Sequence, residues 1–212
     1  MIKLYDFLPC PFGQKVRIVL AEKSLTYDLV EVDLLKGEQR KPEFLRLNPF
    51  GKVPILIDED TTIYDSTIIN EYLDDEYPDP PLLPAVGASS MRARARLFEE
   101  LADSSFTPQV GQLMAEVAKP ESERDPNRVQ RFRQAVERLL DYLNHELDAR
   151  QFLATEFSVA DIGFAPRLAV LSRLGIEAGN GRPNVDGWIR RLLERPSIQG
   201  LQGVSVDPVL GA

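Results

Sequence analysis

The chain has 212 residues, of which 43% are hydrophobic and 27% are charged, and its formal net charge is −8 at pH 7. This length predicts one large domain or two modest ones, and we expect two. The negative charge disfavours direct binding of nucleic acid, because such binding depends on Lys and Arg displacing counterions from phosphates.

The amino terminus, the apolar runs and the cysteine and histidine counts exclude several other classes of protein. The amino terminus has no basic segment followed by an apolar run, so it predicts no secretion signal, and no apolar run approaches the roughly 20 residues of a membrane-spanning helix. We therefore expect a cytoplasmic protein without membrane contacts. Cys10 is the only cysteine and His145 the only histidine, which predicts no internal disulfide and no metal site.

The first part of the chain predicts a small α/β domain. Residues 1–7 read as a strand, residues 12–23 carry apolar side chains at helical spacing, and residues 27–34 alternate as a second strand. This βαβ unit predicts parallel pairing with a right-handed crossover. A short helix over 41–47 follows.

Two further strands and a helix complete this domain. Residues 53–57 and 61–64 flank the turn Asp58-Glu59-Asp60, which predicts antiparallel strands, and Ser66 begins a helix. The prolines of Tyr77–Pro84 cannot continue that helix. We therefore predict a domain over residues 1–77 and a linker over residues 78–89.

The remainder, residues 90–212, predicts an all-helical domain. Long helices are expected over 91–118 and 127–147, and a final one over 185–194 that holds Trp188 in the core. Between them, Ser158 and Asp161 fit a shortened capping box, and Phe157 with Ile162 fits a hydrophobic staple. We interpret this segment as structural.

Cys10 is the first candidate for chemistry. It follows the first strand and precedes the first helix, so its sulfur is expected near backbone N–H groups and the positive helix end, which favours the thiolate. The alternative is an inert buried cysteine that acts as a small hydrophobe.

Two later segments carry groups suited to a small zwitterionic thiol. Pro54 stands at the start of a strand, where a cis bond would turn backbone groups outward, although an ordinary trans proline is the alternative. Ser66 offers a hydroxyl and helix-start N–H groups to a carboxylate, while Asp65 would attract an amine. The alternative for Asp65-Ser66 is a plain helix cap.

These motifs, taken in order, resemble the cytosolic glutathione transferase superfamily over nearly the whole chain. The resemblance implies an α/β thioredoxin-like N-terminal domain, an all-α C-terminal domain and a homodimer. The residues that carry it are Cys10-Pro11-Phe12, Val16–Leu20, Lys41-Pro42-Glu43, Asn48–Pro54, Asp65-Ser66 and Ser158-x-x-Asp161.

The resemblance also implies roles for individual residues. Cys10-Pro11-Phe12 is similar to the omega class, whose nucleophile is a cysteine at this point, and the overall spacing resembles the zeta class, which uses serine there. Asp6 stands about where other classes keep a catalytic tyrosine. By the same resemblance glutathione would contact Val53 before a cis Pro54, Asp65 and Ser66 at its γ-glutamyl end, and Lys41 at its glycyl carboxylate.

The resemblance leaves the second substrate open, as a small electrophile or a mixed disulfide. Its pocket is expected to draw on Phe7, Leu8 and Phe106. Arg17 is expected to pair with a nearby acid, and His145 to be a solvated helix residue. We expect thiol transfer or deglutathionylation through Cys10, with an external second thiol because the chain has no other cysteine.

A second resemblance points to a different function. Val16–Lys23, Ile68–Asp74, the proline-rich linker and Phe152–Ser158 resemble bacterial stringent starvation protein A. That family keeps the fold and acts by binding RNA polymerase, so the alternative is a non-enzymatic adaptor whose docking face is the linker and the acidic surface. The third hypothesis is a folded protein that binds glutathione and has lost its catalytic activity.

Overall fold

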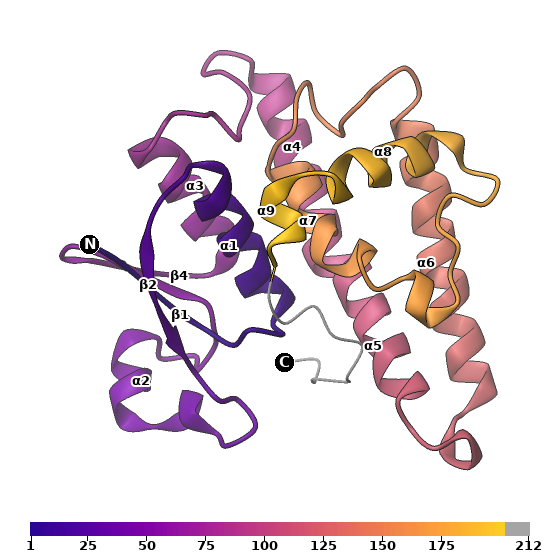
Figure 1. Cartoon of the computed structure of the whole chain (residues 1–212), viewed down its shortest axis with the longest axis horizontal. Coiled ribbons are helices and arrows are strands. Elements are labelled where there is room, and N and C mark those ends of the chain that lie inside the picture. Colours follow the sequence, from indigo (N-terminus) through magenta and orange to yellow (C-terminus); the bar gives the residue numbers. More distant parts are fainter. Residues whose placement is uncertain (202–212) are drawn as a thin grey trace.

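The computed structural model describes residues 1–201, in which a four-stranded sheet with its helices lies beside a helical domain (Figure 1). The strands are β1 (Ile2–Asp6), β2 (Tyr27–Glu31), β3 (Ile55–Asp58) and β4 (Thr61–Tyr64), and their order in the sheet is β2-β1-β3-β4. β1 and β2 are parallel, whereas β3 is antiparallel to both of its neighbours. The predicted βαβ unit and antiparallel pair are both confirmed.

Three helices belong to the sheet domain. α1 (Pro11–Glu22) and α3 (Ser66–Glu76) pack against each other, while α2 (Pro42–Leu47) lies apart from them after a 3-10 turn over Glu38–Arg40 (Figure 1). Pro at the first position of α1 and of α2 suits a helix start, because the missing N–H would have no partner there.

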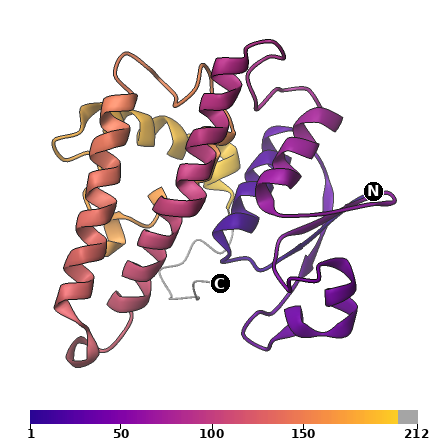
Figure 2. The ribbon, with the colours of Figure 1, turned by 180° about the vertical axis from the view of Figure 1, so that it is seen from behind.

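The helical domain is built around two long antiparallel rods, which are seen from behind in Figure 2. Its other helices are short and pack across these rods. Its helices are α4 (Ser89–Leu101), α5 (Thr107–Val117), α6 (Pro126–Glu146), α7 (Val159–Leu168), α8 (Pro183–Leu193) and α9 (Pro196–Gln199), with 3-10 turns over Glu121–Glu123 and Ser172–Leu174. None of the helices within residues 1–201 is long and apolar enough to cross a membrane.

The first rod is not the single α-helix that the periodicity over 91–118 predicts. A π-helical segment, η2 (Ala102–Phe106), joins α4 to α5, and the N–H of Thr107 reaches back five residues to the carbonyl of Ala102. Pro108 has no N–H with which to continue the ordinary ladder. The wider turn accommodates this missing donor.

α7 is the central element of the helical domain. All ten of its residues are buried, and it packs against α4 on one side and against α1 of the sheet domain on the other. One apolar cluster therefore runs through both domains, from Leu4 in β1 to Trp188 in α8. The prediction that Trp188 belongs to the core is confirmed, because its side chain is fully buried.

The capping box before α7 is present as predicted. The backbone N–H of Ser158 donates to Asp161 Oδ2 at 3.0 Å, and the Ser158 side chain receives the N–H of Asp161. Asp161 also accepts hydrogen bonds from the indole N–H of Trp188 at 2.8 Å and from the N–H of Leu153 at 3.0 Å. The segment thus ties the start of α7 to α8.

The linker between the domains is hydrogen-bonded to the C-terminal end of α1. α3 ends at Glu76, before the predicted linker over 78–89, and α4 begins at the last residue of that range, Ser89. The last eleven residues of the predicted helical domain, 202–212, lie outside the described residues. Lys23 Nζ donates to Asp74 at 2.9 Å and to the carbonyls of Tyr77 and Pro80 at 2.7 and 2.8 Å. The buried ammonium group therefore holds the proline-rich turn in place.

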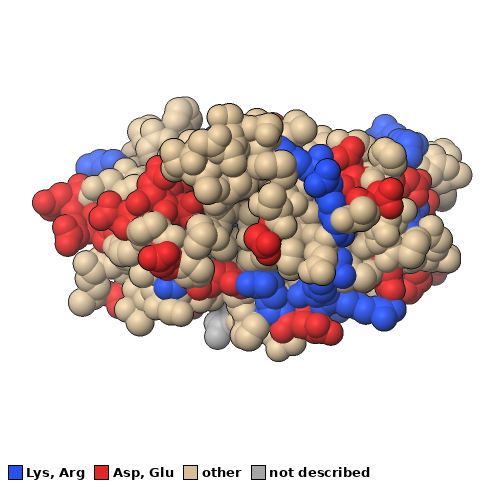
Figure 3. All heavy atoms as spheres, turned by 90° about the horizontal axis from the view of Figure 1, so that it is seen from above, with Lys and Arg blue, Asp and Glu red and all other residues tan. Residues whose placement is uncertain are grey.

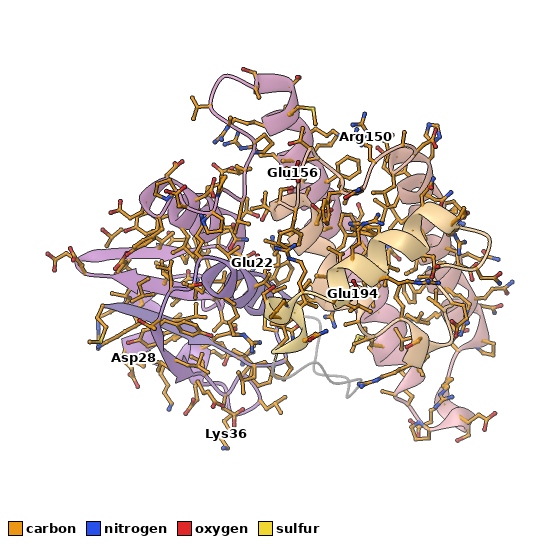
Figure 4. The ribbon with its side chains drawn as sticks, turned by 45° about the horizontal axis from the view of Figure 1, so that its top comes forward. Glu22, Asp28, Lys36, Arg150, Glu156 and Glu194 are labelled. Atoms are coloured by element: carbon orange, nitrogen blue, oxygen red, sulfur yellow. The ribbon has the colours of Figure 1, made fainter. Side chains whose placement is uncertain are left out.

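An ion pair between α1 and α9 joins the two domains directly. Glu22, near the end of α1, faces α9 in Figure 4, and its carboxylate accepts from Arg195 at 2.8 and 2.6 Å and from Ser197. The Arg195 guanidinium also lies 3.7 Å from the centre of the Phe157 ring, a cation–π contact. The C-terminal end of α1 is consequently tied both to the linker and to the helical domain.

Candidate functional site

Cys10 is the N-cap residue of α1, as its place in the sequence predicts. Its backbone is extended, its N–H donates to the carbonyl of Phe7 at 2.7 Å, and its own carbonyl accepts the N–H of Gln14 at 2.9 Å. The backbone N–H groups of Phe12 and Gly13 act on the sulfur as hydrogen-bond donors. The thiol therefore lies at the positive end of the helix.

This position does not favour the thiolate, so that expectation is wrong for this structure. Cys10 is 6% exposed and packs with Val32, Phe44, Val53 and Ile55. Burial, followed by the negative charge of Asp6, raises the pKa of the Cys10 thiol to about 11, against the opposing pull of the two N–H groups. Desolvation of the charged form outweighs the helix end because the surrounding side chains are apolar.

Asp6 and Arg17 form a buried ion pair beneath the start of α1. Arg17 Nε lies 3.0 Å from Asp6 Oδ2, which confirms that Arg17 pairs with a nearby acid, and a second guanidinium nitrogen donates to the carbonyl of Leu8. Burial raises the pKa of Asp6 to about 7 although Arg17 opposes this shift. Gly13 is required here, because a Cβ at that position would stand 1.7 Å from the Asp6 carboxylate.

An open pocket of about 700 Å³ lies beside this helix start, between the sheet domain and the first rod of the helical domain. Its lining comes from the starts of α1 and α3, the loop before β3, the end of β4, the end of α4 and the π-helical segment η2. It contains four of the residues to which the sequence analysis gives a role together with several polar side chains of the helical domain. The lining residues are Phe12, Asn48, Phe50, Lys52, Val53, Pro54, Tyr64, Asp65, Ser66, Thr67, Ile68, Glu100, Asp103 and Ser104.

The Val53–Pro54 bond is cis, as the sequence analysis anticipates for this strand start. Both residues are buried and line the pocket, and the regular ladder of β3 begins only at Ile55. The backbone of Val53 therefore stands at the pocket wall beyond the paired part of the strand. Asn48 supports this loop by donating its side-chain amide to the carbonyl of Lys52 at 2.8 Å.

Asp65 and Ser66 are both at the pocket, and Asp65 also caps α3. Its carboxylate accepts the N–H groups of Thr67 and Ile68 at 3.0 and 3.3 Å, which is the plain helix-cap role. Its φ of 78° is unusual for a residue with a side chain, and such backbone positions cluster at ligand sites. Ser66, 5% exposed, is the first residue of the helix.

The structure does not bring Lys41 to this pocket. Lys41 Nζ pairs with Glu38 at 2.9 Å and lines a different hollow with Tyr5 and Phe44. Lys52 lines the pocket instead, directly before Val53. The sequence analysis missed Lys52, although its position beside the proline-containing motif was the signal available.

The helical domain gives the pocket an acidic wall. Asp103 Oδ2 accepts from Lys15 Nζ at 2.6 Å and from the Thr67 hydroxyl at 3.3 Å, and Lys15 also pairs with the buried Glu99 at 2.9 Å. Two carboxylates thus share one ammonium group, and burial raises the pKa of both Asp103 and Glu99. With Asp65 and Glu100 nearby, this end of the pocket suits a cation.

The second pocket that the sequence analysis draws from Phe7, Leu8 and Phe106 is not present as such. Phe106 is fully buried and packs on Phe164 with ring centres 5.2 Å apart, because the π-helical segment turns it into the core. Leu8 lines a separate hollow with Arg17 and Pro196, and Phe7 packs near Cys10. This expectation is therefore corrected for Phe106.

Charge is distributed unevenly over the face seen from above. Acidic side chains gather over the sheet-domain end, whereas Lys and Arg gather over the middle and the helical domain (Figure 3). The exposed prolines of the linker adjoin Asp75, Glu76 and Asp79, which are also exposed. The prolines and acidic side chains of this segment are therefore accessible, and their role in docking stays a prediction.

Comparison with known proteins agrees with this architecture. The family model described as the glutathione S-transferase N-terminal domain matches residues 4–81, and the one described as the C-terminal domain matches residues 106–196. The chain is similar to glutathione S-transferase 3 of Zea mays, at 31% identity over 93% of this chain and 91% of that protein. It is also similar to a stringent starvation protein A homologue of Haemophilus influenzae, at 35% identity over 88% and 82% of the two chains.

Among solved structures, the glutathione transferase URE2P6 of Phanerochaete chrysosporium in complex with oxidized glutathione superposes with a TM-score of 0.83. The two sequences are 30% identical, and the match covers 94% of each chain. The order of strands, the cis proline beside the pocket and the buried α7 thus occur in a chain that the N-terminal and the C-terminal domain models both match. The chain belongs to the glutathione S-transferase family.

Proposed function

We propose that this protein is a glutathione-dependent transferase that carries out thiol transfer through Cys10. The observation that carries the proposal is the pocket beside the start of α1. It joins a cationic side chain, a helix start and an acidic wall around the backbone of Val53.

Each end of glutathione finds an opposite charge there. Glutathione carries two carboxylates and one ammonium group. We place the γ-glutamyl carboxylate at Ser66 and the N–H groups that begin α3, and the ammonium group at Asp65 and Asp103. The glycyl carboxylate would then reach Lys52, and the cysteinyl backbone would pair with Val53.

The reaction proceeds in two exchanges. The Cys10 thiolate attacks the glutathionyl sulfur of a mixed disulfide, forms a Cys10–glutathione disulfide and releases the other half as a thiolate. A second glutathione thiolate then attacks that disulfide, which releases oxidised glutathione and restores Cys10. Two electrons pass from glutathione to the mixed disulfide, and the second thiol is external because the chain has no other cysteine.

The raised pKa of Cys10 slows this reaction without forbidding it. Moving the thiol pKa from 9.0 to about 11 lowers the thiolate fraction at pH 7 by about 100-fold. A more basic thiolate is a stronger nucleophile, with a sensitivity of about 0.4 to 0.5 per pKa unit, so the net loss of rate is about 12-fold. Binding glutathione beside the sulfur offsets such a factor through proximity.

The test compares glutathione-dependent reduction of a small mixed disulfide by the wild type and by Cys10→Ser, with chlorodinitrobenzene conjugation measured in parallel. We expect disulfide reduction by the wild type and at least a 100-fold loss in the variant. Reduction that survives the substitution would refute the Cys10 mechanism. Conjugation that improves in the serine variant would instead point to a serine-class reaction.

The adaptor function is the second candidate, and the similarity to stringent starvation protein A homologues favours it. On this reading the exposed linker prolines and the neighbouring acids bind RNA polymerase. The discriminating experiment is a pull-down with purified RNA polymerase, beside a variant in which Pro80 and Pro81 are alanine. No recovery by the wild type would count against the adaptor.

We also expect two copies of the chain to associate. Phe50 is 71% exposed and packs edge-on against Tyr64, and Ile68 and Leu97 are exposed at 56% and 58%. Such exposed apolar side chains are typical of a contact between chains. Light scattering after gel filtration is expected to give twice the mass of 23.9 kDa.

A further inference from the structure

Four cations are buried within residues 1–201, and one of them stands apart from the others. Lys15, Arg17 and Lys23 each form an ion pair with a carboxylate at 2.6 to 3.0 Å. Arg167, at the end of α7, is 7% exposed and has no carboxylate partner among the described residues. A buried charge without an opposite charge is costly, so its retention calls for an explanation.

The guanidinium of Arg167 is also short of hydrogen bonds. Nη1 donates to the Met114 sulfur at 3.0 Å, which is a weak acceptor, and the buried Nε has no partner within the described part of the chain. Gly111, on the neighbouring α5, leaves space on this side, because a Cβ built there would stand 3.8 Å from Nη2 with nothing closer. The planar group therefore has unused donors that suit a carboxylate.

Arg167 lies within electrostatic range of Cys10 at the start of α1. α7 and α1 pack against each other, and the charges of Arg167 and of an ionised Cys10 act on one another. The Cys10 thiol is itself protonated at neutral pH because its pKa is about 11, so it does not neutralise the guanidinium. An anionic group bound next to the sulfur on the α7 side would therefore be attracted to this guanidinium.

We propose that Arg167 binds a carboxylate on the second substrate, and so selects mixed disulfides or electrophiles whose leaving or reacting half is anionic. This inference rests on the proposed function, because it takes Cys10 as the reacting group. It assigns the glutathione half to the Lys52 side of the site and the variable half to the α7 side. Arg167 is then a specificity-determining residue that the sequence motifs do not include.

The first measurement needs no turnover. Calorimetry compares the binding of S-(2-carboxyethyl)glutathione with that of the neutral S-(2-carbamoylethyl)glutathione, which has nearly the same size. We expect the wild type to bind the carboxylate at least fivefold more tightly. Arg167→Gln should abolish the difference, Arg167→Lys should retain part of it, and the surface control Arg133→Gln, whose guanidinium only holds loop carbonyls, should leave it unchanged.

The second measurement uses turnover with glutathione mixed disulfides of 3-mercaptopropionate, 2-mercaptoethanol and cysteamine. We expect kcat/KM to fall in that order, mainly because KM rises. In Arg167→Gln the three mixed disulfides should have similar kcat/KM values. If the wild type shows Cys10-dependent turnover without any preference in either measurement, the Arg167 inference is overturned and the proposed function stands.

The two proposals can therefore fail separately. A carboxylate preference in calorimetry that Arg167→Gln removes, combined with no turnover, would keep the Arg167 site and refute the transferase mechanism. Failure of the wild type to bind either conjugate would overturn both. If Arg167→Gln does not fold, the wild-type comparison of the carboxylate with its amide still decides, because equal affinities refute the inference.

Discussion

Opposing effects meet at the sulfur of Cys10. The N–H groups of Phe12 and Gly13 favour the thiolate, while burial and the charge of Asp6 favour the thiol and raise its pKa to about 11. The balance depends on how much water reaches the sulfur, which no local sequence motif specifies. The titration of this one group therefore reports directly on the environment at the start of α1.

Alkylation of Cys10 by iodoacetamide is expected to accelerate about tenfold per pH unit from pH 7 to beyond pH 9, since only the thiolate reacts. The chain has a single cysteine, so mass spectrometry gives an unambiguous rate. Free glutathione serves as the control and should level off near its ordinary pKa. A plateau for Cys10 below pH 8 would contradict the buried, protonated thiol.

Two lysines, Lys52 at the pocket and Lys41 outside it, allow a matched comparison. Lys52→Ala should weaken glutathione binding about fivefold, because an exposed charged contact contributes about 1 kcal/mol. Lys41→Ala removes the same charge, but the only described interaction that it breaks is the ion pair with Glu38. The dissociation constant for glutathione should therefore stay within about twofold of the wild type. Calorimetry decides between them, and the reverse order of effects would restore Lys41 to the site.

At the scale of elements, the capping box connects α7 to α8 through one buried carboxylate. Asp161→Ala leaves the N–H groups of Leu153, Ser158 and Trp188 without an acceptor, and we expect a loss of about 3 kcal/mol in the free energy of unfolding. Asp125→Ala, which removes the exposed cap of α6, should cost about 1 kcal/mol.

Urea unfolding of both variants gives these values directly. Equal losses of unfolding free energy in the Asp161 and Asp125 variants would show that burial does not increase the stability that the α7 cap contributes. Intrinsic fluorescence of Trp188 supplies an independent readout, because its indole N–H bonds to Asp161.

The order of elements follows from the sequence, since the βαβ pattern, the antiparallel pair and the helix caps are local signals. The π-helical segment is different. Residues 102–106 keep the apolar spacing of a helix, and only the combined packing of Phe106 on Phe164 with the missing N–H of Pro108 decides the wider turn. Lys52 directly precedes the predicted Val53-Pro54 motif, so a sequence signal for it exists. No local signal marks Arg167, because its neighbours Met114 and Gly111 come from α5.

At the scale of the whole molecule, buried carboxylates give stability an unusual dependence on pH. Asp6, with a pKa of about 7, binds a proton in the folded state at pH values where the unfolded carboxyl, near 3.8, has lost it. The stability that this proton contributes is complete below pH 3.8 and is lost as the pH rises through 7. Asp161, with a pKa of about 6, adds a change of the same sign.

Between pH 6 and 7 the free energy of unfolding should therefore fall by roughly 1 kcal/mol, mainly through Asp6. Asp6→Asn should flatten the profile in this interval, even if its stability is lower throughout because the ion pair with Arg17 is lost. Chemical unfolding at pH 6.0, 6.5 and 7.0 tests this. A wild-type stability that rises across the interval would mean that Arg17 keeps Asp6 ionised.

α1 packs against elements of both domains. Its residues from Gly13 to Leu20 are buried, Cys10 precedes it, and Glu22 near its end binds Arg195 of α9. A chimaera that exchanged the helical domain for that of a relative would have to preserve the surface of α7 that faces this helix. Otherwise the start of α1, with Cys10, would lose part of its packing. Recombination within this protein is thus constrained to segments away from α1, such as the loop between α5 and α6, where new sequence would leave this packing untouched.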